Sequence, residues 1–320
     1  MTKKNFKIII ISILIAATYC RGSVEIKAMA ADAEKIASAG MRSTDERVRA
    51  NAVEVISGSG RSEMVSDVAS LLNDPSVVVR FAAAVAAGDM NYRQSREKLK
   101  QLTKDKDLNV VMASSYALCK MGEGKYFKEI EKNALNKNQT IRANAAMLMG
   151  KLGREDSLPT LYKIKDSTDS SNIAAFNATE AIAKIGDEKI YKKIWTMLIS
   201  VYADDRYMGA QAMAALGDTR GANALITLLD DEILEVRLAS AGQLGSLGDR
   251  SGKIIIQEYL SGQQPADKAV AERCNVLATL AIGQIGDEQL AVYLPKLLRS
   301  ESPFVQLAAA KSVFMLDKAR

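Results

Sequence analysis

The sequence predicts an all-α solenoid of nine stacked two-helix units, and the first observation behind this prediction is a recurring 13-residue segment. A clear copy is VRLASAGQLGSLG at residues 236–248. Its first position recurs at Val48, Val79, Val110, Ile141, Ala174, Asp205, Val236, Cys274 and Val305. Six of the eight gaps between these positions are 31 residues, and the other two are 33 and 38. A period of this size is typical of a stack of equivalent helical units.

The second observation is the apolar spacing inside this segment. Offsets 0, 4, 8 and 11 from its first position are apolar or small in most copies, and this spacing forms one face of a helix, which we call the B helix. A shorter A helix precedes it, for example at 219–229, with a polar turn at 230–232 between the two. Neither helix can bury its face alone, so the neighbouring units must supply the core. No strand is expected.

Capping residues divide the chain in the same way. Asp or Asn precedes the B helix in several copies, and Gly follows it where a left-handed cap is needed, at Gly122, Gly153, Gly186, Gly217, Gly248 and Gly286. The units are expected to start near residues 31, 61, 93, 124, 155, 187, 219, 250 and 287. Residues 31–320 are therefore expected to form one repeat array. The low aromatic content and the absence of linker tracts favour a single elongated domain over several globular ones.

Residues 1–30 are expected to be a signal peptide or an N-terminal anchor. Three lysines precede an apolar run at 8–17, which is too short for a comfortable membrane span. Cleavage after Ala30 fits the Ala28-Met29-Ala30 pattern, while Cys20 resembles the acylated cysteine of bacterial lipoproteins; an uncleaved anchor is the third alternative. The protein is therefore expected to be exported to the periplasm or cell envelope, with membrane contact only through this segment.

The charge of the repeat array argues against nucleic-acid binding. The whole chain has 43 Lys and Arg against 38 Asp and Glu, and residues 1–30 hold five of the basic and one of the acidic residues. The array is left with 38 basic and 37 acidic residues, a net charge of +1. Global attraction to a phosphate backbone is therefore not expected.

Residue types also argue against catalysis and cofactors. The chain contains no histidine, which excludes Ser-His-Asp and Cys-His nucleophilic sites. Cys119 and Cys274 lie in distant units, so neither a disulfide between them nor an ordinary zinc site is expected. We expect a protein that is not an enzyme, with no catalytic residue, metal or cofactor.

The recurring segment resembles the HEAT-like repeat family, in the short-unit form also found in phycobilin lyases and deoxyhypusine hydroxylases. The resemblance rests on pairs such as Val48 with Arg49, Ile141 with Arg142 and Val236 with Arg237, and on Leu-Gly-Asp at 216–218 and 247–249. It implies a right-handed superhelix in which this Arg bonds carbonyls and the turn Asp of a neighbouring unit. The iron-binding His-Glu motifs of the hydroxylases have no counterpart here.

In this family, offsets 2, 3, 6 and 10 of the B helix face the concave surface. Aromatic, Met and Lys residues at these offsets are the candidate partner-binding set: Phe81, Met112, Tyr116, Lys120, Met147, Lys151, Phe176, Lys184 and Tyr207. They predict a groove with a basic edge that binds a protein or peptide partner carrying apolar and acidic groups. Two alternatives stay open: a phycobilin-lyase-like module that holds a flat small molecule in this groove, and an architectural scaffold whose groove is filled by its own side chains.

Overall fold

The computed structural model describes residues 26–217 and 219–318, and these residues contain helices and no strand. Lys3, Lys4, Lys7 and Cys20 lie outside them, so the leader and lipidation predictions fall outside the described residues. Helical backbone covers 26–40, and Met29 and Ala30 are buried in its packing. The array boundary expected at residue 30 therefore falls inside a packed helix.

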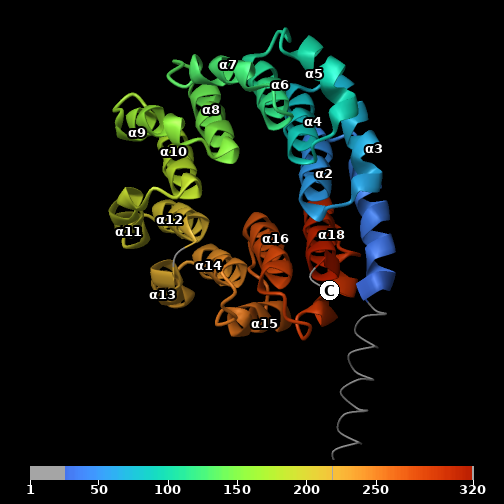
Figure 1. The fold of residues 1–320 in the computed structure, drawn as a ribbon. Helices are drawn as coiled ribbons and strands as arrows, with labels where there is room; N and C mark the ends of the chain where they lie inside the picture. Colours follow the sequence, from blue (N-terminus) through green and yellow to red (C-terminus); the bar gives the residue numbers. More distant parts are fainter. Residues whose placement is uncertain (1–25, 218, 319–320) are drawn as a thin grey trace, which may run out of the picture.

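Within the described residues, nine long B helices form the inner layer of the fold (Figure 1). They are α2 (Glu46–Ser59), α4 (Val77–Asp89), α6 (Leu108–Lys120), α8 (Gln139–Leu152), α10 (Asn172–Ile185), α12 (Ala203–Leu216), α14 (Leu234–Ser246), α16 (Lys268–Ile285) and α18 (Pro303–Lys318). Each packs against the B helix of the next unit, as the repeat pattern predicts. Small residues at the contacts, many of them Ala, let the helices approach closely.

Shorter A helices form the outer layer, preceded by the helix at 26–40 in the first unit. They are α3 (Val65–Ser70), α5 (Arg96–Leu102), α7 (Phe127–Glu131), α9 (Leu158–Asp166), α11 (Tyr191–Leu198), α13 (Thr219–Thr227), α15 (Lys253–Ser261) and α17 (Leu294–Leu297). Six of them follow or lie close behind a 3₁₀ turn: η1 (Ser62–Met64), η3 (Arg93–Ser95), η4 (Gly124–Tyr126), η5 (Glu155–Ser157), η6 (Glu188–Ile190) and η8 (Ala291–Tyr293). Two more 3₁₀ turns, η2 (Leu71–Asn73) and η7 (Leu228–Asp230), extend α3 and α13. Pro159 and Pro295 lie in the first turn of α9 and α17, where the missing amide costs little.

The predicted glycine caps after the B helices are confirmed. All six glycines that the sequence places after B helices have positive φ, between 66° and 96°. Gly60 occupies the same position in the first unit with φ 76°, and Asn91 does so in the second with φ 49°. Asn also adopts the left-handed conformation at low cost, so Asn91 caps its B helix where the other units have Gly.

The recurring Arg side chains tie neighbouring units together, as the family resemblance implies. Arg206 donates to both carboxylate oxygens of Asp231 in the next unit, at 2.6 and 2.9 Å, and to the carbonyl of Ser200 in its own turn at 3.0 Å. Arg49 with Asp74 and Arg80 with Asp105 repeat this arrangement. Since both partners are largely buried, these bidentate pairs are structural.

Arg206→Ala is expected to lower the free energy of unfolding by about 3 to 5 kcal/mol, because it leaves the buried Asp231 carboxylate without its partner. Desolvation raises the pKa of Asp231, but hydrogen bonds from Arg206 and the Ile233 amide outweigh it and hold the pKa below its usual 3.8. The stabilisation is thus present above that value and is lost as the pH falls through the lowered pKa.

Arg237→Ala is the matched control, because Arg237 donates to the carbonyls of Asp231 and Glu232 and, among the described residues, forms no ion pair with a following unit. Its melting temperature should fall less than that of Arg206→Ala. Equal falls in thermal melts of the two variants would show that the ion pair between units adds nothing.

The stack closes on itself, and here the expectation of an elongated domain is wrong. The last B helix, α18, packs against the first, α2, so the nine units form a ring (Figure 1). Across this seam a Cβ placed on Gly40 would lie 3.2 Å from a Leu307 methyl, and Phe314 is fully buried. The seam therefore has an apolar core like the contacts between successive units.

Charged groups also bridge the seam. Arg61, just after α2, pairs with Asp317 of α18 at 2.6 Å and with Glu34 of the first helix at 3.3 Å. Its guanidinium also stacks on the ring of Phe314, 5.1 Å from the centroid. One side chain thus links the first helix, α2 and α18.

No helix in the described ranges 26–217 and 219–318 is both long enough and apolar enough to span a bilayer.

Candidate functional site

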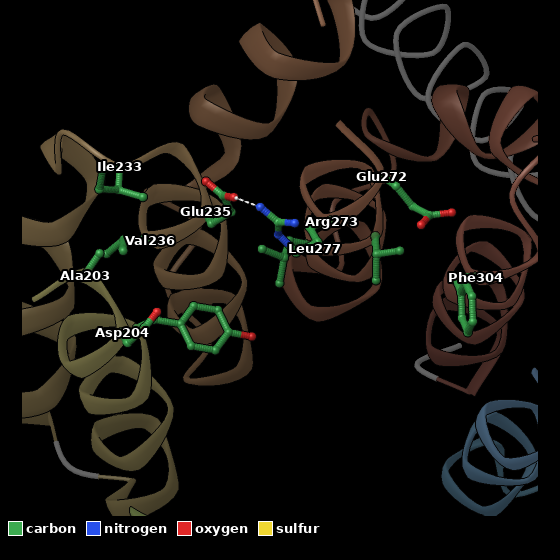
Figure 2. Close-up of a pocket in the computed structure, with 11 residues that line it drawn as sticks. Ala203, Asp204, Ile233, Glu235, Val236, Glu272, Arg273, Leu277 and Phe304 are labelled. Carbon is green, nitrogen blue, oxygen red and sulfur yellow. Dashed lines mark hydrogen bonds and ion pairs between the residues drawn. The ribbon is translucent and has the colours of Figure 1, made fainter. Parts of the chain in front are cut away.

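An open cavity of about 720 Å³ lies on the inner side of the ring (Figure 2). Its lining comes from the N-terminal parts of four consecutive B helices, α12, α14, α16 and α18, and from the turn before α14. The lining residues are Ala203, Asp204, Tyr207, Ile233, Glu235, Val236, Glu272, Arg273, Val276, Leu277 and Phe304. No A helix contributes, so the cavity belongs to the concave face.

Apolar side chains make up most of this lining, and the charged groups stand at its rim. Figure 2 shows Arg273 reaching across to Glu235, and the two form an ion pair at 3.2 Å. Glu272 accepts a hydrogen bond from the Ser302 hydroxyl. With Asp204, the cavity has three carboxylates and one guanidinium, a net charge of −2.

The far end of the cavity reaches the seam. Phe304, at the start of α18, lies under the guanidinium of Arg47 from α2, which is 5.9 Å from the ring centroid. Attraction to Glu272 is one of the smaller contributions that raise the pKa of Arg47, after its hydrogen bond and ion pair with Asp45. Because first and last units meet here, ring closure completes this wall of the cavity.

Among the nine predicted partner-binding residues, only Tyr207 lines this cavity. It is partly exposed, and desolvation by the surrounding helices raises the pKa of its hydroxyl. Phe176, at the same offset one unit earlier, lines a separate and much smaller cavity of about 100 Å³ with Met197 and Met208. Phe81 and Met147 are half-buried against the core.

Two predicted residues are not available to a partner, which corrects that part of the prediction. Met112 and Tyr116 are fully buried, because α6 packs closely between its neighbours on the concave side. The Tyr116 hydroxyl donates to the carboxylate of Asp89, and burial raises the pKa of that hydroxyl far above its usual value.

The predicted basic edge is largely neutralised within the chain. Lys151 pairs with Asp89 two units away at 3.0 Å, and Lys184 pairs with Glu180 at 2.8 Å. Lys120 is exposed. This ion pair joins α8 to α4, past the intervening α6, which the strong curvature of the inner face brings within reach. Lys151 is therefore engaged within the chain and does not form a free cationic surface.

Glu54 shows how crowded this interior is. Its side chain is reached by solvent, yet desolvation by the surrounding helices raises its pKa, opposed by Lys311 of α18 and Lys151 of α8. Lys311 comes from the last unit, across the seam, and Lys151 comes from the fourth unit. Charged groups of α2, α8 and α18 therefore influence one another inside the ring, whereas the mainly apolar cavity is lined by the N-terminal parts of α12, α14, α16 and α18.

The sequence-based prediction missed most of the cavity. Its missed members include Ile233, Glu235, Glu272, Arg273 and Phe304, which precede the first position of the recurring segment. Val276 and Leu277 do lie at offsets 2 and 3, in the eighth copy. The signal that could have found the others is an apolar or charged residue one to three positions before the first position of the recurring segment, in successive copies.

Neither cysteine in the described part of the chain is suited to nucleophilic chemistry. Burial raises the pKa of Cys119 and of Cys274 to about 11, so both thiols are protonated at neutral pH. Within the same residues no cluster of three or more His, Cys, Asp or Glu side chains could hold a metal ion.

Family models identify the repeats. The HEAT repeat model matches residues 34–123, and the PBS lyase HEAT-like repeat model matches residues 205–231. The chain is a HEAT-like repeat protein. No curated protein sequence matches it.

Solved structures are similar to this chain at low sequence identity. The complex of CpcE and CpcF of phycocyanin lyase from Nostoc sp. PCC7120 is 16% identical over 80% of this chain and 94% of that chain, with a TM-score of 0.45. Human deoxyhypusine hydroxylase is 14% identical over 83% and 98%, with a TM-score of 0.42. Importin beta is 14% identical over 82% of this chain and 40% of its own, with a TM-score of 0.37.

Proposed function

We propose that this HEAT-like repeat protein is a non-enzymatic binding protein whose concave surface holds a protein or peptide partner. The observation that supports this most is the mainly apolar cavity lined by α12, α14, α16 and α18 and by the turn before α14. Large apolar surfaces left open on a folded protein usually mark binding sites. The absence of histidine and the raised pKa values of both thiols support a role without nucleophilic catalysis.

The proposal includes export, which rests on the basic start and the short apolar run at residues 8–17. Burial of Met29 and Ala30 in the first helix favours processing upstream of this helix over cleavage after Ala30. Intact mass of the protein purified from the cell envelope distinguishes these two positions.

Exchanging Phe176→Ser together with Tyr207→Ser is expected to weaken partner capture at least tenfold, about 1.4 kcal/mol, because both remove inward-facing apolar surface. The measurement is capture from envelope extract by the purified protein, with bound molecules identified by mass spectrometry. Both rings are only half-buried, so circular dichroism should remain that of a helical protein.

The matched control is Trp195→Ser, which removes an exposed aromatic ring from the outer helix α11. It should leave capture unchanged. A coloured or mass-shifted native protein that carries a small flat ligand, with no captured protein, would instead support the phycobilin-lyase-like alternative. A double variant that captures as well as wild type would contradict the proposal.

A further inference from the structure

We infer that the cavity between α12, α14, α16 and α18 takes a cationic amphipathic peptide segment, in which Lys or Arg side chains alternate with large apolar ones. This inference rests on the proposed function and specifies its partner. It also reverses the acidic partner that Lys120, Lys151 and Lys184 suggested, since two of those lysines are paired within the chain.

Charge complementarity is the first argument. Three carboxylates line the cavity, and its one cation, Arg273, is already engaged by Glu235. Asp204 and Glu272 stand on opposite sides of the Glu235–Arg273 pair in Figure 2. A ligand cation placed between them gains attraction from both sides, whereas an anion meets net negative charge.

The apolar floor is the second argument. Tyr207, Val276 and Leu277 line the cavity together with these carboxylates, and Phe304 stands at its far end in Figure 2. A cation without an apolar neighbour would leave this floor exposed to water. The arrangement suits a ligand that places apolar and basic groups side by side.

Continuity beyond the cavity favours an extended peptide over a compact small molecule. Ile233 at the cavity edge is followed in the neighbouring turn by Tyr202 and Val201, which are 70% and 84% exposed. Arg206 holds these two turns together, because it donates both to the Val201 carbonyl and to Asp231. The exposed apolar path therefore runs from the cavity over the adjacent turn, in the manner of a groove for several residues of chain.

The test uses three fluorescent dodecapeptides of alternating residues, Leu/Lys, Leu/Glu and Ser/Lys, titrated against the full chain. Leu/Lys should bind at least tenfold more tightly than the other two. Glu235→Gln with Glu272→Gln, which takes the cavity charge from −2 to zero, should weaken Leu/Lys binding at least tenfold. The control, Glu97→Gln with Glu155→Gln, makes the same change in net charge at exposed sites on the outer layer and should have no effect.

Equal binding of Leu/Lys and Leu/Glu, or an equal loss in the control variant, would overturn the inference. Octylammonium binding as tightly as Leu/Lys would also overturn it, in favour of a small cationic amphiphile. If Leu/Glu binds more tightly and Tyr207→Ser abolishes that binding, the proposed peptide-binding function stands while the charge preference fails.

Discussion

Leu307→Asp is expected to open the ring, with a clear increase in the radius of gyration measured by small-angle X-ray scattering. Leu307 is fully buried beside Gly40 of the first unit. In an open chain this face of α18 would be in water, so an aspartate there penalises mainly the closed state. Lost apolar burial contributes about 1.5 to 3 kcal/mol, and desolvation of an unpaired carboxylate adds to it.

The helical content should change little, because the units away from the seam keep their own contacts. Val292→Asp is the matched control: it introduces the same charge in the same ninth unit at a side chain that is 70% exposed. Its scattering should equal that of wild type. A Leu307→Asp protein as compact as wild type would show that the seam does not depend on this contact.

Local features were predictable from the sequence because they depend on residues close together in the chain. Each of the first eight B helices ends at a Gly, or at Asn91, since the left-handed cap needs a residue that tolerates positive φ. The ion pairs between units were predictable for the same reason. The Arg and its Asp partner occupy fixed offsets in adjacent units, as Arg206 and Asp231 do. Among the described residues the cap recurs after eight B helices and the bidentate Arg–Asp pair links units at three places, so a single sequence displays each feature more than once.

Ring closure was not predictable in the same way. It depends on the sum of small rotations between nine units, and no single offset encodes that sum. One local trace does exist in the last unit. There Phe314 occupies offset 9, where every other copy has Gly, Ala, Ser or Cys, and its ring fills the seam under Arg61.

The candidate site was only partly predictable for a related reason. Residues at offset 2 differ in accessibility: Met112 and Leu307 are fully buried, while Tyr207 lines the cavity. How far neighbouring B helices cover an inward side chain depends on their local separation. That separation is set by contacts such as those of the glycines at offset 9. These glycines lie inside the B helices and let neighbouring helices approach, whereas the glycines that follow the B helices act as caps.

Those glycines lead to the other large expected effect: Gly150→Val should destabilise the ring by about 3 kcal/mol or more. Gly150 lies inside α8, and a Cβ there would be 2.6 Å from both the Cα and the Cβ of Ala181 in α10. Ordinary carbon contacts are about 3.5 to 4.0 Å, so the two helices would have to separate by about 1 Å. Gly88, Gly245 and Gly283 show equally close backbone approaches at the same offset.

In Gly150→Ala, helix propensity and packing act on the stability in opposite directions. Replacing a mid-helix Gly by Ala contributes about 1 kcal/mol of stability through propensity alone. Overpacking against backbone atoms costs about 1 to 3 kcal/mol, and a fixed helix cannot yield as a flexible side chain can. We therefore expect a net loss in thermal and denaturant unfolding for Gly150→Ala, a larger one for Gly150→Val, and little change for Gly124→Ala, where an added Cβ meets nothing within 4 Å. A stabilised Gly150→Ala protein would mean that α8 and α10 can move apart at low cost, and the close approach of the B helices would then not be what sets the curvature of the ring.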